Sequence, residues 1–155
     1  MAFDYLPILA ENAAPKPPRK LYRAPRIGWR PLGRPLNEMR VSLVTSAAVR
    51  QTRQRAFTAG GDASHRRIAA DSDIEVIVDH HSPVGRDVRR DAEVVFPRRA
   101  LRELARKGVV GSVAPAHFSI YGGIADHDAI TERLAPELTR RLAAMRVDLA
   151  LMVPY

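Results

Sequence analysis

The stretch DAEVVFPRRALRELARKGVVGSVAPAHFSIYGG, residues 91–123, has the pattern of a helix followed by a buried strand. Pro97 suits the first turn of a helix, because its φ angle is fixed and it has no N–H group. Apolar residues then recur at spacings of three and four as far as Gly108, which predicts an amphipathic helix that ends at a left-handed glycine. The apolar run 109–114 predicts a strand buried on both faces of a parallel sheet.

The end of this predicted strand is the best candidate for a site. Pro115 ends the run, His117 lies just beyond it, and Ser119, Tyr121 and two glycines follow. In open α/β sheets, ligands bind outside the carboxyl ends of the strands. The pattern therefore predicts a site at His117, while a surface loop with an incidental histidine is an equally good interpretation.

Three other apolar runs predict strands of the same sheet, at residues 41–44, 74–81 and 147–153. Residues 130–145 have helical spacing, but Pro136 breaks the pattern, which predicts a short turn from Asp128 followed by a main helix from Pro136. Strands and helices thus alternate. This order predicts a three-layer α/β domain with a mostly parallel sheet of about four strands, of Rossmann or flavodoxin type.

The N-terminal third has a different composition. Residues 1–36 contain seven of the twelve prolines, which predicts an extended arm before an α/β domain at 37–155. Residues 1–56 hold eleven Lys or Arg against three acidic residues, so the net charge of +8 originates there. The apolar side chains of Tyr22, Trp29 and Leu32 favour packing of the arm against a second chain or another copy, and the alternative is an arm folded onto its own domain.

The composition also excludes several classes of chemistry. The 155 residues include no cysteine, so this chain has no disulfide, thiolate metal site or thiol nucleophile. The sequence has no apolar run of membrane-spanning length and no signal-peptide layout, which predicts a cytoplasmic protein without a membrane partner. Because no nucleic-acid recognition motif accompanies the basic charge, a nucleic-acid partner is not expected.

Two polar segments could carry binding groups. Thr45, at the end of the first strand, is small and polar and leaves room for a ligand. The segment 51–68 contains two glycines followed by Asp62, Ser64, His65 and Arg66, but it lacks the Lys-Ser/Thr pair of a phosphate-binding P-loop. The alternative for each of these residues is structural, as a turn cap or an ion pair.

The tripeptide Asp79-His80-His81 lies at the end of the predicted strand 74–81. Carboxylate and imidazole groups at a strand end can bind manganese or zinc. The tripeptide resembles the strand-end motif of the DHH phosphoesterases, which hydrolyse phosphodiesters with metal ions. That family also needs an upstream cluster of acidic residues and histidine, which the segment after residue 44 lacks. A metal site on these three residues is therefore an alternative.

Four blocks in unbroken order resemble the selenoprotein B family, whose members are components of the glycine, sarcosine, betaine and D-proline reductases. The blocks are VSLVTSAAV (41–49), GDASHRRI (61–68), FPRRALRELARKGVVGSVAPAH (96–117) and LAPELTRRLAAMRVDLALMVP (134–154), and the resemblance covers roughly residues 27–154. It implies a reductive reaction in which a selenolate or thiolate attacks the α-carbon of a small amine and helps to cleave the C–N bond.

In this family the selenocysteine or cysteine follows the strand that matches residues 147–153, where this sequence ends. The resemblance therefore implies that the redox centre lies on a partner or a missing segment, with no cofactor in this chain. Three explanations stay open: a selenocysteine codon read as a stop, a separate polypeptide that completes the site, or a derived member without redox chemistry.

The resemblance also implies roles for residues at matching positions. His117 is implied as the catalytic residue, a general acid near the missing nucleophile. The implied substrate-binding residues, together with Thr45 from the pattern above, are Asp62, Ser64, Arg66, His81 and Asp91. The expected function is that of a reductase subunit; a non-catalytic scaffolding subunit and a phosphoesterase are the alternatives.

Overall fold

The computed structural model describes residues 31–58, 61–70, 75–80 and 86–155. The chain divides into two units, Met1–Arg30 and Pro31–Tyr155, and all described residues belong to the second. Most of the predicted arm, residues 1–36, therefore lies outside the described residues, and the arm stays a prediction. No helix in the described ranges is long and apolar enough to cross a membrane.

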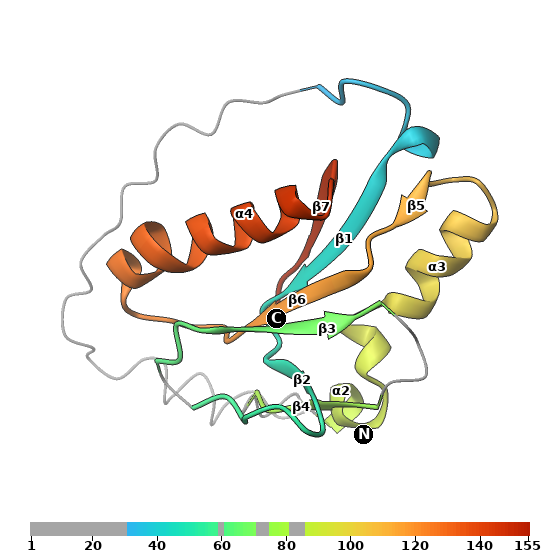
Figure 1. Cartoon of the computed structure of the whole chain (residues 1–155). Helices are drawn as coiled ribbons and strands as arrows, with labels where there is room; N and C mark the ends of the chain where they lie inside the picture. Colours follow the sequence, from blue (N-terminus) through green and yellow to red (C-terminus); the bar gives the residue numbers. More distant parts are fainter. Residues whose placement is uncertain (1–30, 59–60, 71–74, 81–85) are drawn as a thin grey trace, which may run out of the picture. The chain divides into compact units, whose positions relative to one another are not determined.

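The fold is organised around β1 (Arg40–Thr45), which lies in the middle of a five-stranded sheet (Figure 1). On one side β1 pairs in parallel with β7 (Leu149–Val153) over five residues. On the other side it pairs in parallel first with β5 (Ser112–Val113) and then with β6 (Ala116–Ile120). The next strand, β3 (His65–Ala69), runs antiparallel to β6.

Strands β5 and β6 form one interrupted strand along the edge of β1. Arg40 pairs with Ser112, whereas Val44 pairs with Phe118, so the register shifts by two residues between the two strands. The extra residues are Ala114 and Pro115, and Pro115 has no N–H to give to the ladder. The predicted strand 109–114 is wrong at both ends, because residues 109–111 form a turn and the chain continues as a strand beyond Pro115.

Helix α3 (Arg98–Arg106) follows Pro97 and ends before Gly108, which has a φ of 72°. This confirms the predicted helix and its left-handed glycine. Leu101 on its inner face is almost fully buried, whereas Leu104 is 41% exposed. Two short helices, α2 (Arg86–Arg90) and the 3-10 helix η2 (Ala92–Val94), precede it, and another 3-10 helix, η1 (Leu36–Glu38), precedes β1.

The main α-helix begins one residue before Pro136, close to the predicted start, but the chain before it is helical as well. A π-helical segment, η3 (Ala129–Leu134), passes directly into α4 (Ala135–Ala144), with Pro136 in the first turn of α4. Proline cannot donate the bond to the carbonyl four residues earlier, and its ring would clash with that carbonyl. The wider π-helical turn before Pro136 makes room for the proline ring and for the missing hydrogen bond, so the chain stays helical.

Side chains of β1 alternate between two hydrophobic clusters. Val41 and Leu43 belong to the cluster that contains Leu101 of α3, whereas Val44 belongs to the cluster that contains Leu138 of α4. The predicted α/β class is confirmed, with a mixed five-stranded sheet in place of a mostly parallel sheet of about four strands. The three-layer, Rossmann-like or flavodoxin-like arrangement stays a prediction.

Two strands lie in segments that the sequence pattern assigns to loops. β2 (Val49–Gln51) pairs antiparallel with β4 (Val76–Val78) in a separate two-stranded sheet, and β4 is the described core of the predicted strand 74–81. β3 has the sequence HRRIA, in which only Ile68 is buried. An edge strand with one buried residue gives no alternating apolar pattern, which explains why the prediction missed it.

Gly111 is required where the turn before β5 crosses the start of β1. A β-carbon at this position would lie 2.6 Å from the carbonyl carbon of Glu38 and 2.8 Å from the backbone nitrogen of Met39. We therefore expect Gly111→Ala to lower the free energy of unfolding by about 1–3 kcal/mol in urea denaturation, the usual cost of overpacking. Gly33→Ala is the control, because a β-carbon there meets nothing within 4 Å. Equal stability of the two variants would contradict this packing constraint.

Candidate functional site

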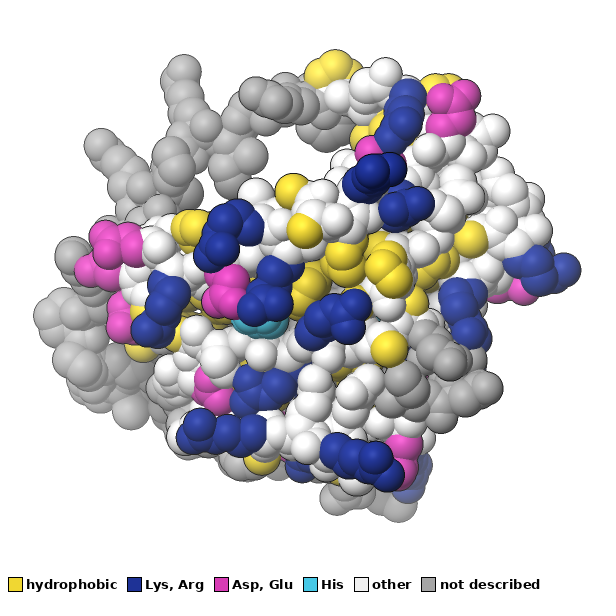
Figure 2. Space-filling model, viewed as in Figure 1, with side chains coloured by type: hydrophobic (Ala, Val, Ile, Leu, Met, Phe, Trp, Pro, Cys, Tyr) yellow, Lys and Arg dark blue, Asp and Glu magenta, His cyan; other side chains and the backbone are white. Residues whose placement is uncertain are grey.

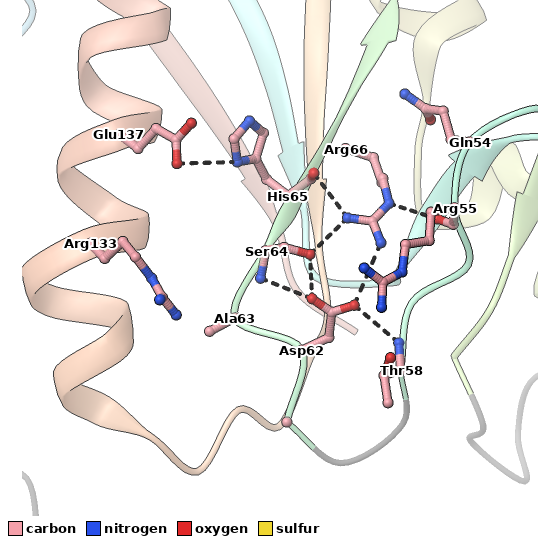
Figure 3. Close-up of a pocket in the computed structure, with 11 residues that line it drawn as sticks. Gln54, Arg55, Thr58, Asp62, Ala63, Ser64, His65, Arg66, Arg133 and Glu137 are labelled. Carbon is pink, nitrogen blue, oxygen red and sulfur yellow. Dashed lines mark hydrogen bonds and ion pairs between the residues drawn. The ribbon is translucent and has the colours of Figure 1, made fainter.

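A cavity of about 940 Å³ lies between the segment that precedes β3 and the helix η3–α4 (Figure 3). One wall is the loop that includes Arg55 and Thr58, and the opposite wall carries Arg133 and Glu137. The lining residues are Gln54, Arg55, Thr58, Gly61, Asp62, Ala63, Ser64, His65, Arg66, Arg133 and Glu137. Most of them are charged or polar, so the cavity suits a small polar ligand.

Strand register places this cavity beside the carboxyl end of β6. Because β3 is antiparallel to β6, its first residue His65 pairs with Ile120, the last residue of β6. Tyr121 forms a bridge with Ala47, which follows β1. The cavity thus borders the edge of the sheet at which the sequence pattern predicts a site, although the lining residues come mainly from the loop before β3.

Three of the predicted substrate-binding residues, Asp62, Ser64 and Arg66, form one hydrogen-bonded network (Figure 3). Oδ1 of Asp62 accepts from the backbone N–H of Ser64 at 3.0 Å and from its hydroxyl. Oδ2 accepts from the N–H of Thr58 at 3.0 Å, and Arg66 lies 3.5 Å from the same oxygen. Although burial raises the pKa of Asp62, the hydrogen bonds from Ser64 and Thr58 and the Arg66 charge lower it overall.

The Arg66 guanidinium holds the loop before β3 in place. It lies over the ring of Phe57, with 4.0 Å from Cζ to the ring centroid, and its side chain is 11% exposed. Each of its nitrogens donates to the protein, at distances of 2.7–3.5 Å. The acceptors are the backbone oxygens of Arg55, Ala56 and His65, Oγ of Ser64 and Oδ2 of Asp62. Arg66 therefore has few donors left for a ligand, and its geometry is that of a positioning residue.

His65, which belongs to the polar segment 51–68, also lines the cavity, although the family resemblance implies no role for it. Its Nδ1 lies 3.9 Å from Oε2 of Glu137, and its ring meets Phe118 edge-on at 5.5 Å. Burial lowers the pKa of His65; Glu137 opposes this effect, and the charges of Arg141 and Arg66 add to it. A histidine beside a cavity can accept a proton in its neutral form and donate one in its protonated form, and the ordinary pKa of this couple lies near neutral pH. The only available sequence signal was its place between Ser64 and Arg66.

A row of rings connects the cavity with the carboxyl ends of β1 and β7. Phe57, under Arg66, lies 6.3 Å from Tyr121, which stacks on His80 at 5.2 Å. His80 in turn meets Tyr155 edge-on at 5.1 Å, and the backbone N–H of Tyr155 donates to Ser46 Oγ at 2.9 Å. Residues from four separate segments are thus packed together at this edge of the sheet.

His117 lies inside β6 rather than beyond a strand end, and its side chain is fully buried. Its Nδ1 accepts a hydrogen bond from the backbone N–H of Leu43 at 3.1 Å, and its ring meets Phe96 edge-on at 5.8 Å. Nε2 has no hydrogen-bond partner among the described residues. Burial and the charge of Arg98 lower the pKa of His117 to about 4. Its catalytic role stays a prediction, because the described chain gives the ring no contact with the cavity.

The other predicted binding residues do not line the cavity. Thr45 is fully buried, and its Oγ1 accepts from the N–H of Ala47 at 3.2 Å. Asp91 caps η2 through the N–H of Glu93 and pairs with Arg99 at 3.1 Å. His81 lies outside the described residues. The substrate-binding roles of all three stay predictions.

The alternative metal site on Asp79, His80 and His81 stays a prediction, because His81 lies outside the described residues. Asp79 Oδ2 accepts from Arg50 Nε at 2.8 Å and from the N–H of Phe57 at 2.9 Å. His80 stacks in the row of rings. Asp79 therefore serves to join β4 to the loop after β2.

A curated relative is D-proline reductase subunit gamma of Acetoanaerobium sticklandii, which is 33% identical over 125 residues. The match covers 80% of this chain and 52% of the relative, so the chain spans about half the length of the protein it matches. No family model and no solved structure matches the chain significantly. The similarity supports a relationship to a reductase subunit, and the narrower selenoprotein B assignment is not confirmed by it.

The buried neutral state of His117 predicts a specific dependence of stability on pH. The unfolded chain takes up a proton below about pH 6.5, whereas the folded chain resists protonation until about pH 4. The free energy of unfolding should therefore fall by up to about 3 kcal/mol as the pH drops from about 6.5 to about 4. Above about pH 6.5, His117 should not change the free energy of unfolding.

His117→Asn places an amide oxygen near the Nδ1 position and does not titrate. We expect urea denaturation between pH 4 and 7 to show a shallower loss of stability for this variant than for the wild type. Parallel pH profiles of the two proteins would contradict the buried neutral state.

Proposed function

We propose that this chain is a subunit of an oxidoreductase that cleaves a C–N bond of a small amine, similar to the selenoprotein B component of glycine, betaine, sarcosine and D-proline reductases. The observation that carries the proposal is the 33% identity to D-proline reductase subunit gamma over 125 residues. The polar cavity beside the carboxyl ends of the strands supports it, because ligands of α/β sheets bind at this edge.

In this proposal the nucleophile comes from outside the given sequence, which has no cysteine. A selenolate or thiolate attacks the α-carbon and forms a C–Se or C–S bond, while the bonding electron pair leaves with the nitrogen. The departing amine takes up a proton. A partner thiolate then attacks the selenium or sulfur and breaks the new C–Se or C–S bond, so that the carbon leaves with the electron pair and takes up a proton. The selenosulfide or disulfide that remains is reduced by a dithiol. This chain provides the cavity, the charged groups that orient the substrate, and the proton donor.

The geometry favours His65 over His117 as this proton donor. His65 lines the cavity and faces the carboxylate of Glu137, whereas His117 is fully buried with Nδ1 bonded to Leu43. A donor must come within hydrogen-bond reach of the group that it protonates, either directly or through one water. We therefore assign the role to His65, with the family-based assignment of His117 as the competing one.

The proposal includes a second chain or further copies, and a cytoplasmic location. β7 lies at one edge of the sheet and presents Leu151 and Met152 at 45% and 63% exposure. Edge strands of this kind readily pair with another chain. On the face shown in Figure 2, Lys and Arg side chains surround a hydrophobic strip and are interspersed with acidic ones, which favours a protein partner over nucleic acid.

Two other functions account for parts of the molecule. A non-catalytic scaffolding subunit would need the β7 edge but not the cavity. Metal-dependent phosphoester hydrolysis would need Asp79, which the described structure ties to Arg50 and Phe57. The same arrangement of strands and helices supports the Rossmann-like or flavodoxin-like layering as part of the reductase proposal.

The first test is purification of the tagged full chain from its source under reducing conditions. We expect a polypeptide with a reactive selenol or thiol to co-purify, as detected by labelling with iodoacetamide. When a dithiol is supplied, the complex should open the ring of D-proline at its Cα–N bond or release the amine of an acyclic amino acid such as glycine, and the isolated chain should not. Recovery of an active chain without any selenol or thiol partner would contradict the proposal.

The second test compares the two histidines in the assembled complex. His65→Gln should lower kcat by roughly 10²–10⁴-fold, the usual contribution of a positioned general acid. His65→Gln should also remove the limb of the pH–rate profile that reports this residue. If His117→Asn lowers kcat and His65→Gln does not, at a pH where the His117 variant is fully folded, then His117 is the proton donor.

A further inference from the structure

The positive and negative charges around the cavity are not balanced. Both carboxylates in the lining already have protein partners. Asp62 is bound by Thr58, Ser64 and Arg66. Glu137 pairs with Arg141 at 2.7 Å and lies near His65, and the Arg141 hydrogen bond is the main reason why the pKa of Glu137 is lowered.

Two arginines in the same lining, Arg55 and Arg133, have no ion-pair partner among the described residues. Both are exposed side chains, and each has a full set of guanidinium donors available. In Figure 3 they enter from opposite walls, with Asp62 and Ala63 between them. The cavity therefore carries two positive charges that no carboxylate in the described part of the chain neutralises.

The placement of Arg133 follows from the local helix geometry. It lies in the last turn of the π-helix η3, three residues before Pro136. The wider π-helical turn changes the direction in which its side chains project relative to a regular α-helix. Segments of this kind occur frequently at functional sites, and here the segment forms one wall of the cavity.

We propose that Arg55 and Arg133 hold the carboxylate group of a small organic acid in this cavity. The inference rests on the cavity of the proposed function and specifies the chemical class of its ligand. A guanidinium donates two parallel hydrogen bonds to a carboxylate, and two arginines on opposite walls can hold both of its oxygens. The other end of the ligand then faces the His65–Glu137 pair, which also lines the cavity.

A carboxylate fits this lining better than a phosphate. Phosphate sites use a cradle of free backbone N–H groups, often at the beginning of a helix. The backbone N–H groups of Thr58 and Ser64 both donate to Asp62 and are not available for such a cradle. The charged donors of the lining that no described carboxylate pairs with are the two side-chain guanidinium groups, which match a planar carboxylate.

The test is calorimetric titration of the full chain at low ionic strength with three probes: propionate, its neutral analogue propionamide, and inorganic phosphate. Propionate should bind and propionamide should not, and added salt should weaken propionate binding. Arg55→Gln and Arg133→Gln should each weaken propionate binding by about tenfold or more, and the double variant should abolish it. Arg140→Gln is the matched control, because Arg140 is an exposed residue of α4 outside the cavity lining.

Several results would overturn the inference: no propionate binding by the wild type, equal binding of propionamide, tighter binding of phosphate, or the same affinity in the arginine variants. Circular dichroism of each variant shows whether it is folded, and the single variants keep the test valid if the double variant is not. Arginine-dependent propionate binding without any thiol or selenol partner would retain this site and reject the reductase proposal. Co-purification of a thiol or selenol partner without propionate binding would retain the reductase proposal and reject this site.

Discussion

The fold depends on the position of β1, which has hydrogen-bonded strands along both sides and hydrophobic clusters on both faces. Five of its six residues are buried. A strand in this position must be largely apolar on both faces and must leave no backbone group unpaired. Its parallel pairing with β6 and β7 places Thr45, Ile120 and Val153 at one edge of the sheet, which is where the cavity and the row of rings lie.

The sequence predicts well those elements whose burial leaves a pattern. The apolar runs of β1 and β7, and the helix between Pro97 and Gly108, are readable because burial and capping fix their residue types. β3 leaves almost no pattern, since an edge strand with one buried residue resembles a polar loop. The bulge at Ala114 and Pro115 misled the prediction in another way, because proline was interpreted as the end of a strand that in fact continues.

The residues of the candidate site also divide into those that the sequence predicts and those that it does not. Asp62, Ser64 and Arg66 are close in sequence, so a local segment was enough to group them. The opposite wall comes from η3 and α4, and no local pattern connects Arg133 or Glu137 with the segment before β3. The emphasis on His117 followed from the misplaced strand end: with β6 extended to Ile120, His117 falls inside the strand and His65 falls beside its carboxyl end.

The row of rings also limits how sequences of this type can change. Phe57, His80, Tyr121 and Tyr155 come from four different segments, yet each ring packs on the next. Gly122 adds a further limit, because a β-carbon there would lie about 3 Å from Ser46 O, Tyr155 O and His80 Nε2. A larger or smaller ring at one position must be matched at its neighbour. These positions should therefore co-vary in related sequences, which makes this edge of the sheet a single evolutionary unit.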